Sequence, residues 1–184
     1  MKNILTLAGC LLGAALHLSS VAQTTPPDDP VGWAMEAGVQ EFTLGGGGAS
    51  NKDFDDSFGS VDFSYGSYLS PRAMWALRQS LAYTNPDDGD NGWAGATRLA
   101  YDYHLSSDTV TRPFLGVNAG RIYGDTVHDT WTAGLEGGAK FYVKSSTFVY
   151  ALASYDWLFD EGNDVDDRFG DGRFSWSLGI GYNF

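Results

Sequence analysis

Apolar and polar residues alternate along most of this chain, and the alternation continues to its last residue. In the closing stretch RFSWSLGIGYNF, residues 173–184, every second residue is apolar or aromatic, and those between are charged, small or polar. A period of two is typical of a β-strand whose two faces meet different surroundings, whereas an amphipathic helix would show a period of about 3.6. No convincing helical pattern follows residue 30, so the chain is predicted to be all-β.

The alternating pattern recurs eight times at regular spacing. The predicted strands are 32–44, 59–69, 73–84, 92–105, 111–123, 130–143, 147–159 and 169–184. The second, fourth and sixth connections are short and turn-like: 70–72, 106–110 and 144–146. The other four are longer and hold three, three, two and five acidic residues in chain order: 45–58, 85–91, 124–129 and 160–168. An antiparallel up-and-down order gathers these acidic connections at one end and the tight turns at the other.

The chemistry of the two strand faces indicates which solvent each one meets. In the strands 92–105 and 130–143, one face is apolar and aromatic, and the other is mostly Gly, Ala and Thr with a few charges of both signs. A soluble eight-stranded carrier would show the same period with its apolar face inside. Small residues, however, suit the narrow interior of an eight-stranded cylinder. The predicted fold is therefore an eight-stranded antiparallel up-and-down transmembrane β-barrel, with its last strand paired to its first because hydrocarbon offers a free edge no hydrogen bonds.

Aromatic residues support this orientation. The chain contains six Trp, ten Tyr and eleven Phe, and those on the apolar faces lie largely near strand ends. Rings in these places fit the two girdles at the surfaces of a membrane.

The first 22 residues resemble a secretory signal peptide. Lys2 is followed by an apolar run and by small residues before Gln23, and the run is too short for a spanning helix. The stretch LAGC at 7–10 leaves a lipid-modified Cys10 as an alternative. Residues 23–30 are predicted to be a short extended leader, and residues 31–184 the barrel domain. Cys10 is the only cysteine, so a processed chain would hold no disulfide, thiol nucleophile or cysteine metal site.

The charge of the chain excludes one class of partner. The formal net charge is −12, and removal of residues 1–22 with Lys2 would make it −13. Because phosphate binding requires a basic patch, nucleic acid is not expected as a partner. The glycines 45–48 lack the following lysine and the strand-to-helix context of a phosphate-binding loop. They are predicted to begin a flexible loop, and no cofactor is expected.

Three stretches carry a resemblance to a known family: RPFLGVNAGRIYGD (112–125), GLEGGAKFYV (134–143) and SLGIGYNF (177–184). They resemble the small eight-stranded outer-membrane barrels, like the transmembrane domain of OmpA and its porin-like relatives. The resemblance covers about residues 31–184. It implies a monomer in the bacterial outer membrane, in contact with lipid and lipopolysaccharide. It also implies that the barrel-assembly machinery recognises the terminal Phe184.

Charged residues on the small-residue face are predicted to form a polar network in the barrel lumen. The candidates are Glu36, Arg78, Arg98, Asp102, Glu136 and Lys140, with Asp62 as a further member. Charges in so narrow a space must pair or be hydrated, because one unpaired buried charge costs several kcal/mol. We expect this network to form a static polar plug that fills the barrel, because eight strands leave an interior only wide enough for side chains. The alternative is a gated ion path in which the ion pairs rearrange.

The acidic connections offer oxygen ligands that suit calcium or magnesium. The candidates for weak cation binding are Asp160, Glu161, Asp164, Asp166 and Asp167. They lack the ordered spacing of a helix–loop–helix calcium site, so a plain solvated loop is the alternative and no dedicated metal site is predicted.

Catalysis is not expected. His104 and Ser106 have the spacing of a nucleophile arrangement, as in barrels that modify lipid A, but strand counting places them at the turn end. The sequence therefore predicts a non-enzymatic integral outer-membrane barrel that contributes to envelope integrity or surface interaction through its acidic loops. A narrow porin-like channel for small solutes or ions is the alternative, and a lipid A-modifying enzyme is a third hypothesis.

Overall fold

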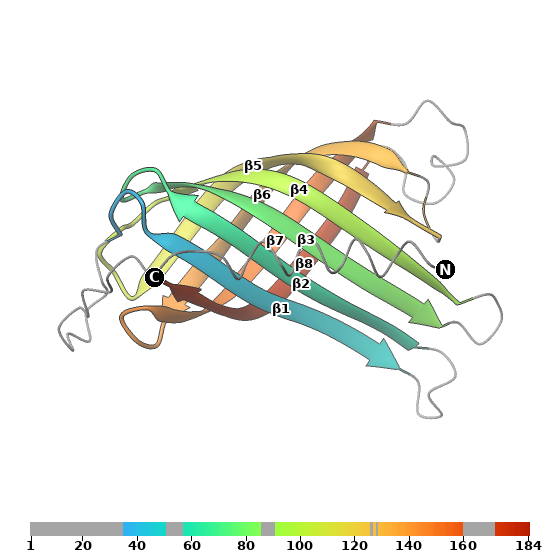
Figure 1. Cartoon of the computed structure of the whole chain (residues 1–184), viewed down its shortest axis with the longest axis horizontal. Coiled ribbons are helices and arrows are strands. Elements are labelled where there is room, and N and C mark those ends of the chain that lie inside the picture. Colours follow the sequence, from blue (N-terminus) through green and yellow to red (C-terminus); the bar gives the residue numbers. More distant parts are fainter. Residues whose placement is uncertain (1–34, 51–56, 86–90, 126, 128, 160–171) are drawn as a thin grey trace.

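Eight strands form one closed barrel. The computed structural model describes residues 35–50, 57–85, 91–125, 127, 129–159 and 172–184. The strands are β1 (Gln40–Ser50), β2 (Ser57–Tyr68), β3 (Ala73–Asn85), β4 (Gly92–His104), β5 (Thr111–Gly124), β6 (Thr130–Tyr142), β7 (Thr147–Phe159) and β8 (Gly172–Asn183). Each pairs antiparallel with its neighbours in the chain, and β1 pairs with β8 (Figure 1). The predicted up-and-down barrel is confirmed.

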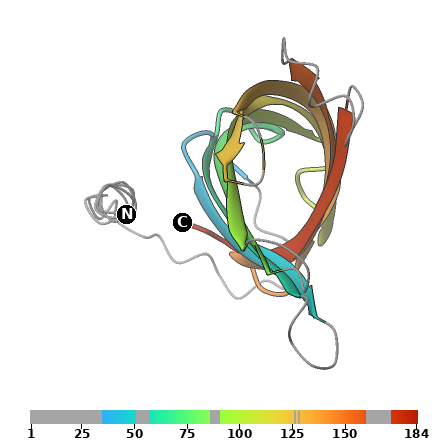
Figure 2. The ribbon, with the colours of Figure 1, turned by 90° about the vertical axis from the view of Figure 1, so that its right-hand side faces the viewer.

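The two ends of the barrel differ in their connections. We call the end with the connections 69–72, 105–110 and 143–146 the turn end, and the opposite end the loop end. Figure 2, turned by 90° from Figure 1, shows the strands as a ring seen along the barrel. The described residues contain no helix long and apolar enough to cross a bilayer. The predicted signal peptide and leader lie outside the described residues.

The first strand is where the sequence prediction was wrong. The other seven agree with the structure within three residues at each end, but β1 runs from Gln40 to Ser50 instead of 32–44. Gly38 has a φ of 92°, which favours glycine, and its N–H donates to the Tyr68 carbonyl oxygen at 2.7 Å. The chain therefore turns before the ladder begins.

The glycines 45–48, predicted to begin a loop, lie inside β1. Their small size has a packing reason. A Cβ at Gly45 would lie 2.5 Å from the Tyr150 hydroxyl oxygen and 2.7 Å from the Leu178 carbonyl oxygen. Absence of a side chain at Gly45 thus allows Tyr150 to reach across the inner wall.

The apolar face of the sheet is its outer face. Large apolar side chains stand exposed all around the barrel, with Trp131 at 65%, Trp176 at 67% and Leu99 at 59% exposure. Their neighbours in sequence point inward and are buried or half-buried, because successive residues of a strand face opposite sides. This is the reverse of a soluble carrier, whose apolar residues line the interior.

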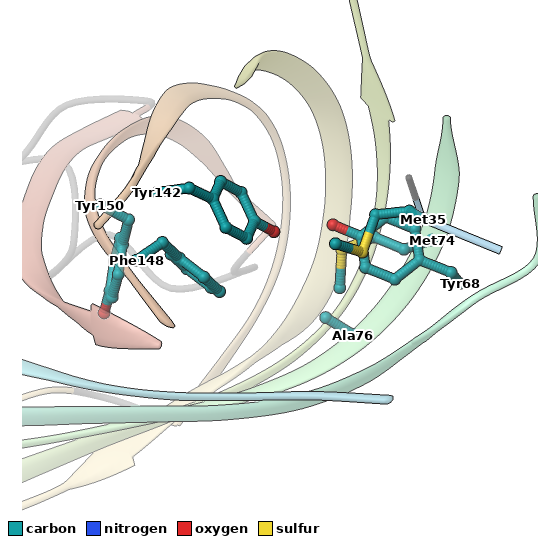
Figure 3. Close-up of a cluster of buried hydrophobic side chains, with 7 residues drawn as sticks. All are labelled: Met35, Tyr68, Met74, Ala76, Tyr142, Phe148 and Tyr150. Carbon is teal, nitrogen blue, oxygen red and sulfur yellow. The ribbon is translucent and has the colours of Figure 1, made fainter. Parts of the chain in front are cut away.

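An apolar and aromatic cluster fills the bore near the turn end. It consists of Met35, Tyr68, Met74, Ala76, Tyr142, Phe148 and Tyr150 (Figure 3). Met35 reaches the cluster from the segment ahead of β1. Glycines on neighbouring strands make room for the rings, since a Cβ at Gly181 would clash with the Phe148 ring and one at Gly138 with the Phe114 ring. The core of this protein is therefore the closed turn end of its bore.

Candidate functional site: the polar bore

Ten charged side chains of the described strands point into the bore. Five are basic and five are acidic: Arg78, Arg98, Arg112, Lys140, Arg173, Glu41, Asp62, Asp102, Glu136 and Asp156. Their formal charges cancel. Since an uncompensated charge in a low-dielectric interior is costly, this balance allows the strands to bury so many ionisable groups.

Arg78 on β3 joins two carboxylates in the middle of the bore. Its Nη2 lies 2.6 Å from Asp102 Oδ2 on β4, and its Nη1 contacts Glu136 Oε1 on β6. Asn118 on β5 donates from Nδ2 to Glu136 Oε2 at 3.0 Å. Asp102 and Glu136 are both cross-strand partners of Gly116, so the two carboxylates approach each other over a position without a side chain. The group links four consecutive strands.

A second ion pair lies beside the first. Arg98 Nη1 is 3.5 Å from Asp156 Oδ2, and both side chains are buried. Arg98 is the direct cross-strand partner of Arg78, and like charges in such positions destabilise a sheet. Each arginine therefore requires an acidic partner of its own, which Asp156 on β7 provides for Arg98.

The third cluster lies at the turn end, around Lys140 on β6. Its Nζ donates to both carboxylate oxygens of Glu41 on β1 at 2.7 Å, and to the Tyr68 hydroxyl oxygen at 3.2 Å. The rings of Tyr68, Phe114 and Phe148 surround the ammonium group at 5.3 to 5.6 Å. A cation between aromatic faces and a carboxylate is stabilised by both.

Further polar contacts close the turn end. Arg112 lies over the Tyr142 ring at 4.2 Å, and its Nε donates to the Thr109 carbonyl oxygen at 3.0 Å. Asn183 near the end of the chain donates from Nδ2 to the Tyr142 hydroxyl oxygen at 2.6 Å. Together with Met35, these side chains occupy the space between the strands, so the bore is filled at this end.

The His104–Ser106 pair considered for catalysis is not assembled. His104 points into the bore, where Nε2 pairs with the Tyr68 hydroxyl at 3.4 Å and Nδ1 lies 3.2 Å from the Arg72 carbonyl oxygen. Ser106 Oγ instead donates to the Thr111 carbonyl oxygen at 3.1 Å. The two side chains thus bind different partners.

Five of the six predicted lumen residues point inward: Arg78, Arg98, Asp102, Glu136 and Lys140. Arg78, Asp102 and Glu136 share one cluster, Arg98 lies beside it, and Lys140 belongs to the turn-end cluster. Asp62 also faces inward and is half-buried.

The prediction that Glu36 faces the lumen is wrong. Glu36 is exposed in the segment before β1, because the turn at Gly38 separates it from the ladder. Glu41 takes the place opposite Lys140.

Four inward charges of the described strands were not among the predicted members of the network: Glu41, Arg112, Asp156 and Arg173. Asp156 and Arg112 could have been found by counting alternate positions along their strands, since each lies on the side opposite a mainly apolar face. Glu41 could not, because the first strand was shifted.

The candidate cation ligands Asp160, Glu161, Asp164, Asp166 and Asp167 lie outside the described residues. Within the described ranges, no three His, Cys, Asp or Glu side chains are grouped so that they could hold a metal ion.

The sequence matches no protein-family model and no curated protein. The solved structures that share its fold include the following three. Neisserial surface protein A (NspA) is 15% identical with a TM-score of 0.54, over 79% of this chain and 96% of that one. The N-terminal β-barrel domain of Pseudomonas aeruginosa OprF is 19% identical with a TM-score of 0.52, over 81% and 98%. OprG from Pseudomonas aeruginosa is 11% identical with a TM-score of 0.51, over 81% and 97%. The chain therefore has the fold of small eight-stranded outer-membrane barrels.

Proposed function

We propose that this protein is a non-enzymatic integral barrel of the bacterial outer membrane, which acts at the cell surface through its acidic loops and supports envelope integrity. The observation that carries the proposal is the combination of an apolar outer wall with a charge-balanced bore that is filled at its turn end. Such a wall is stable in hydrocarbon, and a bore closed at the turn end favours a surface role over bulk transport.

The proposal that lipid surrounds the outer wall is supported by the polar groups on that wall, which form hydrogen bonds with one another. Thr97 donates from Oγ1 to Gln79 Oε1 at 2.6 Å, and Gln79 donates from Nε2 to the Tyr123 hydroxyl oxygen at 2.8 Å. The Tyr123 ring covers Gly95 and shields this group. Outward polar atoms that satisfy each other carry little cost in a medium without water.

The end of the chain is the proposed contact with the barrel-assembly machinery. Phe184 exchanges backbone hydrogen bonds with Gln40 at 2.9 and 3.0 Å, and its ring stacks on Tyr182 on the outer wall. The ring is 41% exposed, so a partner can reach it. We expect a monomer in contact with lipid and lipopolysaccharide.

Cell fractionation combined with heat-modifiable gel mobility tests the proposal. The protein is expected in the outer-membrane fraction, and its unheated form should migrate differently from its boiled form because a closed barrel resists detergent. Recovery as a detergent-free soluble monomer would contradict it.

A narrow channel is the second candidate function. Arg78 is shared by two carboxylates and is the least buried member of its cluster, with 14% side-chain exposure. A side chain in this position has two acceptors between which to move. Conductance measurements distinguish this function from the first.

A further inference from the structure

Arg121 on β5 is the one charged side chain on the outward faces of the eight described strands. Every other outward position of these strands holds an apolar, aromatic, small or uncharged polar residue. The ten charged side chains of the bore face the opposite way. A cation on the lipid side of a barrel is costly at the bilayer midplane and costs little near the membrane surface. The depth of Arg121 therefore decides what it can contact.

Arg121 lies at the loop-side boundary of the apolar band. On β5 the outward residues between Thr111 and Arg121 are all apolar: Pro113, Leu115, Val117 and Ala119. Thr111 and Arg121 are ten residues apart, a rise of about 25 Å at the tilt of a transmembrane strand, which is the height of the band. Because Thr111 begins its strand at the turn end, Arg121 lies at the level of the lipid headgroups on the loop side.

Arg121 ends a row of polar residues that crosses three strands of the outer wall. Gln79 on β3 pairs with Thr97 on β4, and Thr97 pairs with Arg121. Gln79 and Thr97 are satisfied within the protein, because both form hydrogen bonds with the Tyr123 hydroxyl and with each other. Gln79 is 8% exposed, whereas the side chain of Arg121 is 48% exposed. The guanidinium is thus the part of this row that a lipid headgroup can reach.

Asp129, just ahead of β6, orients the guanidinium. Arg121 Nη2 lies 2.7 Å from Asp129 Oδ2, and the two side chains are 48% and 54% exposed. An ion pair with such exposure is worth little. A guanidinium carries five N–H donors in a planar fork, which matches the oxygens of a phosphate as well as those of a carboxylate. An anion of higher charge can therefore compete with Asp129 for Arg121.

Trp131 on β6 forms the wall beside the cation. It is the direct cross-strand partner of Arg121, and the guanidinium carbon lies 6.0 Å from the centre of its ring. The ring is 65% exposed. Tryptophan is favoured where a membrane changes from headgroups to acyl chains, because its ring is apolar and its N–H is polar. The two side chains thus present a cation and an apolar ring to the same lipid.

The outer wall directly below this pair is lined by small side chains. Ala119 and Ala133 are cross-strand partners, each one outward position closer to the turn end. The row continues on either side with Leu99 and Trp157, which are 59% and 41% exposed. An acyl chain can approach the backbone of β5 and β6 more closely at the two alanines than at their large neighbours. The cation therefore lies above a position that suits an acyl chain.

We propose that Arg121 and Trp131 bind a phosphate-monoester lipid of the lipid A class, an inference that rests on the proposed outer-membrane location. The phosphate accepts hydrogen bonds from the Arg121 fork, and an acyl chain lies over Ala119 and Ala133. Because the longer loops of such barrels face the outside, Arg121 meets the leaflet that holds lipopolysaccharide. A phosphate monoester carries about −1.5 to −2 charges at neutral pH. It should displace Asp129 more readily than the singly charged diester of a phospholipid does.

Native mass spectrometry of protein released from vesicles tests the site. The vesicles contain bisphosphorylated lipid A and phosphatidylglycerol in equal amounts within phosphatidylcholine, and one retained lipid A is expected. Arg121→Gln should lower this retention by about tenfold, the loss expected for one charge-assisted hydrogen bond. Arg72→Gln is the matched control, because it removes one exposed arginine at the turn end and should leave retention unchanged.

Dephosphorylated lipid A tests whether the phosphate is the group that Arg121 recognises. The unmodified protein should retain this lipid about tenfold less than the bisphosphorylated one, since the same charge-assisted hydrogen bond is lost. Arg121→Gln should cause no further loss, because two changes that remove one interaction are not additive. A second loss of similar size would show that Arg121 does not contact the phosphate and would overturn the proposal.

Asp129→Asn tests the origin of the selectivity. Removal of the competing carboxylate should raise the retention of phosphatidylglycerol more than that of lipid A, and so narrow the preference between them. An unchanged preference would refute competition with Asp129 as the source of the selectivity.

Two further results would overturn the lipid site: equal retention of lipid A and phosphatidylglycerol by the unmodified protein, or unchanged retention of lipid A by Arg121→Gln. Heat-modifiable mobility of each variant shows that it is folded. A folded, outer-membrane protein that gives either result would refute this site and leave the proposed function standing, whereas a soluble protein would refute both.

Discussion

Lys140 on β6 and Glu41 on β1, 99 positions apart in sequence, form a buried ion pair with Nζ 2.7 Å from both carboxylate oxygens. Both side chains are at most 4% exposed. The pair joins the first strand to the sixth across the bore, so it exists only when the barrel is closed. It also anchors the aromatic cluster that fills the turn end.

Removal of Lys140 alone should destabilise the barrel strongly. Lys140→Met leaves the Glu41 carboxylate buried without its cation, which costs about 3 to 5 kcal/mol of unfolding free energy. The double variant Lys140→Met with Glu41→Leu should recover most of that loss, because it buries no charge. Urea unfolding from lipid vesicles measures the three free energies. A double variant as unstable as the single one would contradict the assigned pairing.

Gly181 should not tolerate a methyl group. Gly181→Ala places a Cβ against the Phe148 ring, and overpacking of this kind costs about 1 to 3 kcal/mol. Phe148→Leu in the same chain should relieve part of the cost. Gly59→Ala is the matched control, since no atom lies within 4 Å of its added Cβ. Similar losses at Gly59 and Gly181, measured by the same unfolding assay, would show that ring packing is not the cause.

The unmodified protein should give no porin-sized steady current in planar bilayers, because side chains fill the turn end. A triple variant with Tyr68→Ala, Tyr142→Ala and Phe148→Ala removes three rings from that end and should raise the current. Tyr101→Ala, on the outer wall, removes a ring without touching the bore and should have no effect. A large stable current through the unmodified barrel would favour the channel function.

Deletion of Phe184 should affect assembly in cells more than folding in vitro. The deletion removes one backbone pair and one ring stack at the barrel edge, so spontaneous folding into vesicles should remain close to that of the full chain. Loss of the proposed recognition signal should nevertheless lower the amount of protein in the outer membrane. Tyr182→Ala, which removes the stacking partner and keeps the terminal Phe, separates the two effects. Equal assembly defects in both variants would indicate a structural role for Phe184.

The alternation along single strands was enough to predict the fold without any tertiary information. A period of two fixes which residues share a face, and the contrast between small polar and large apolar faces fixes which face meets lipid. Arg78, Arg98, Asp102, Glu136 and Lys140 lie on the inner face, where this contrast puts them. The first strand failed because the turn at Gly38 shifts the ladder, and a run of four glycines carries no alternation to read.

Tertiary structure alone decided which charges meet and where the bore is closed. The sequence lists arginines and carboxylates on inner faces, but the stagger of the strands selects Asp102 and Glu136 for Arg78, Asp156 for Arg98 and Glu41 for Lys140. The pairing of β1 with β8, which closes the barrel, is likewise a property of two strands at opposite ends of the chain. A local pattern determines the orientation of each side chain, whereas contacts between distant strands depend on register, which arises only when the sheet closes.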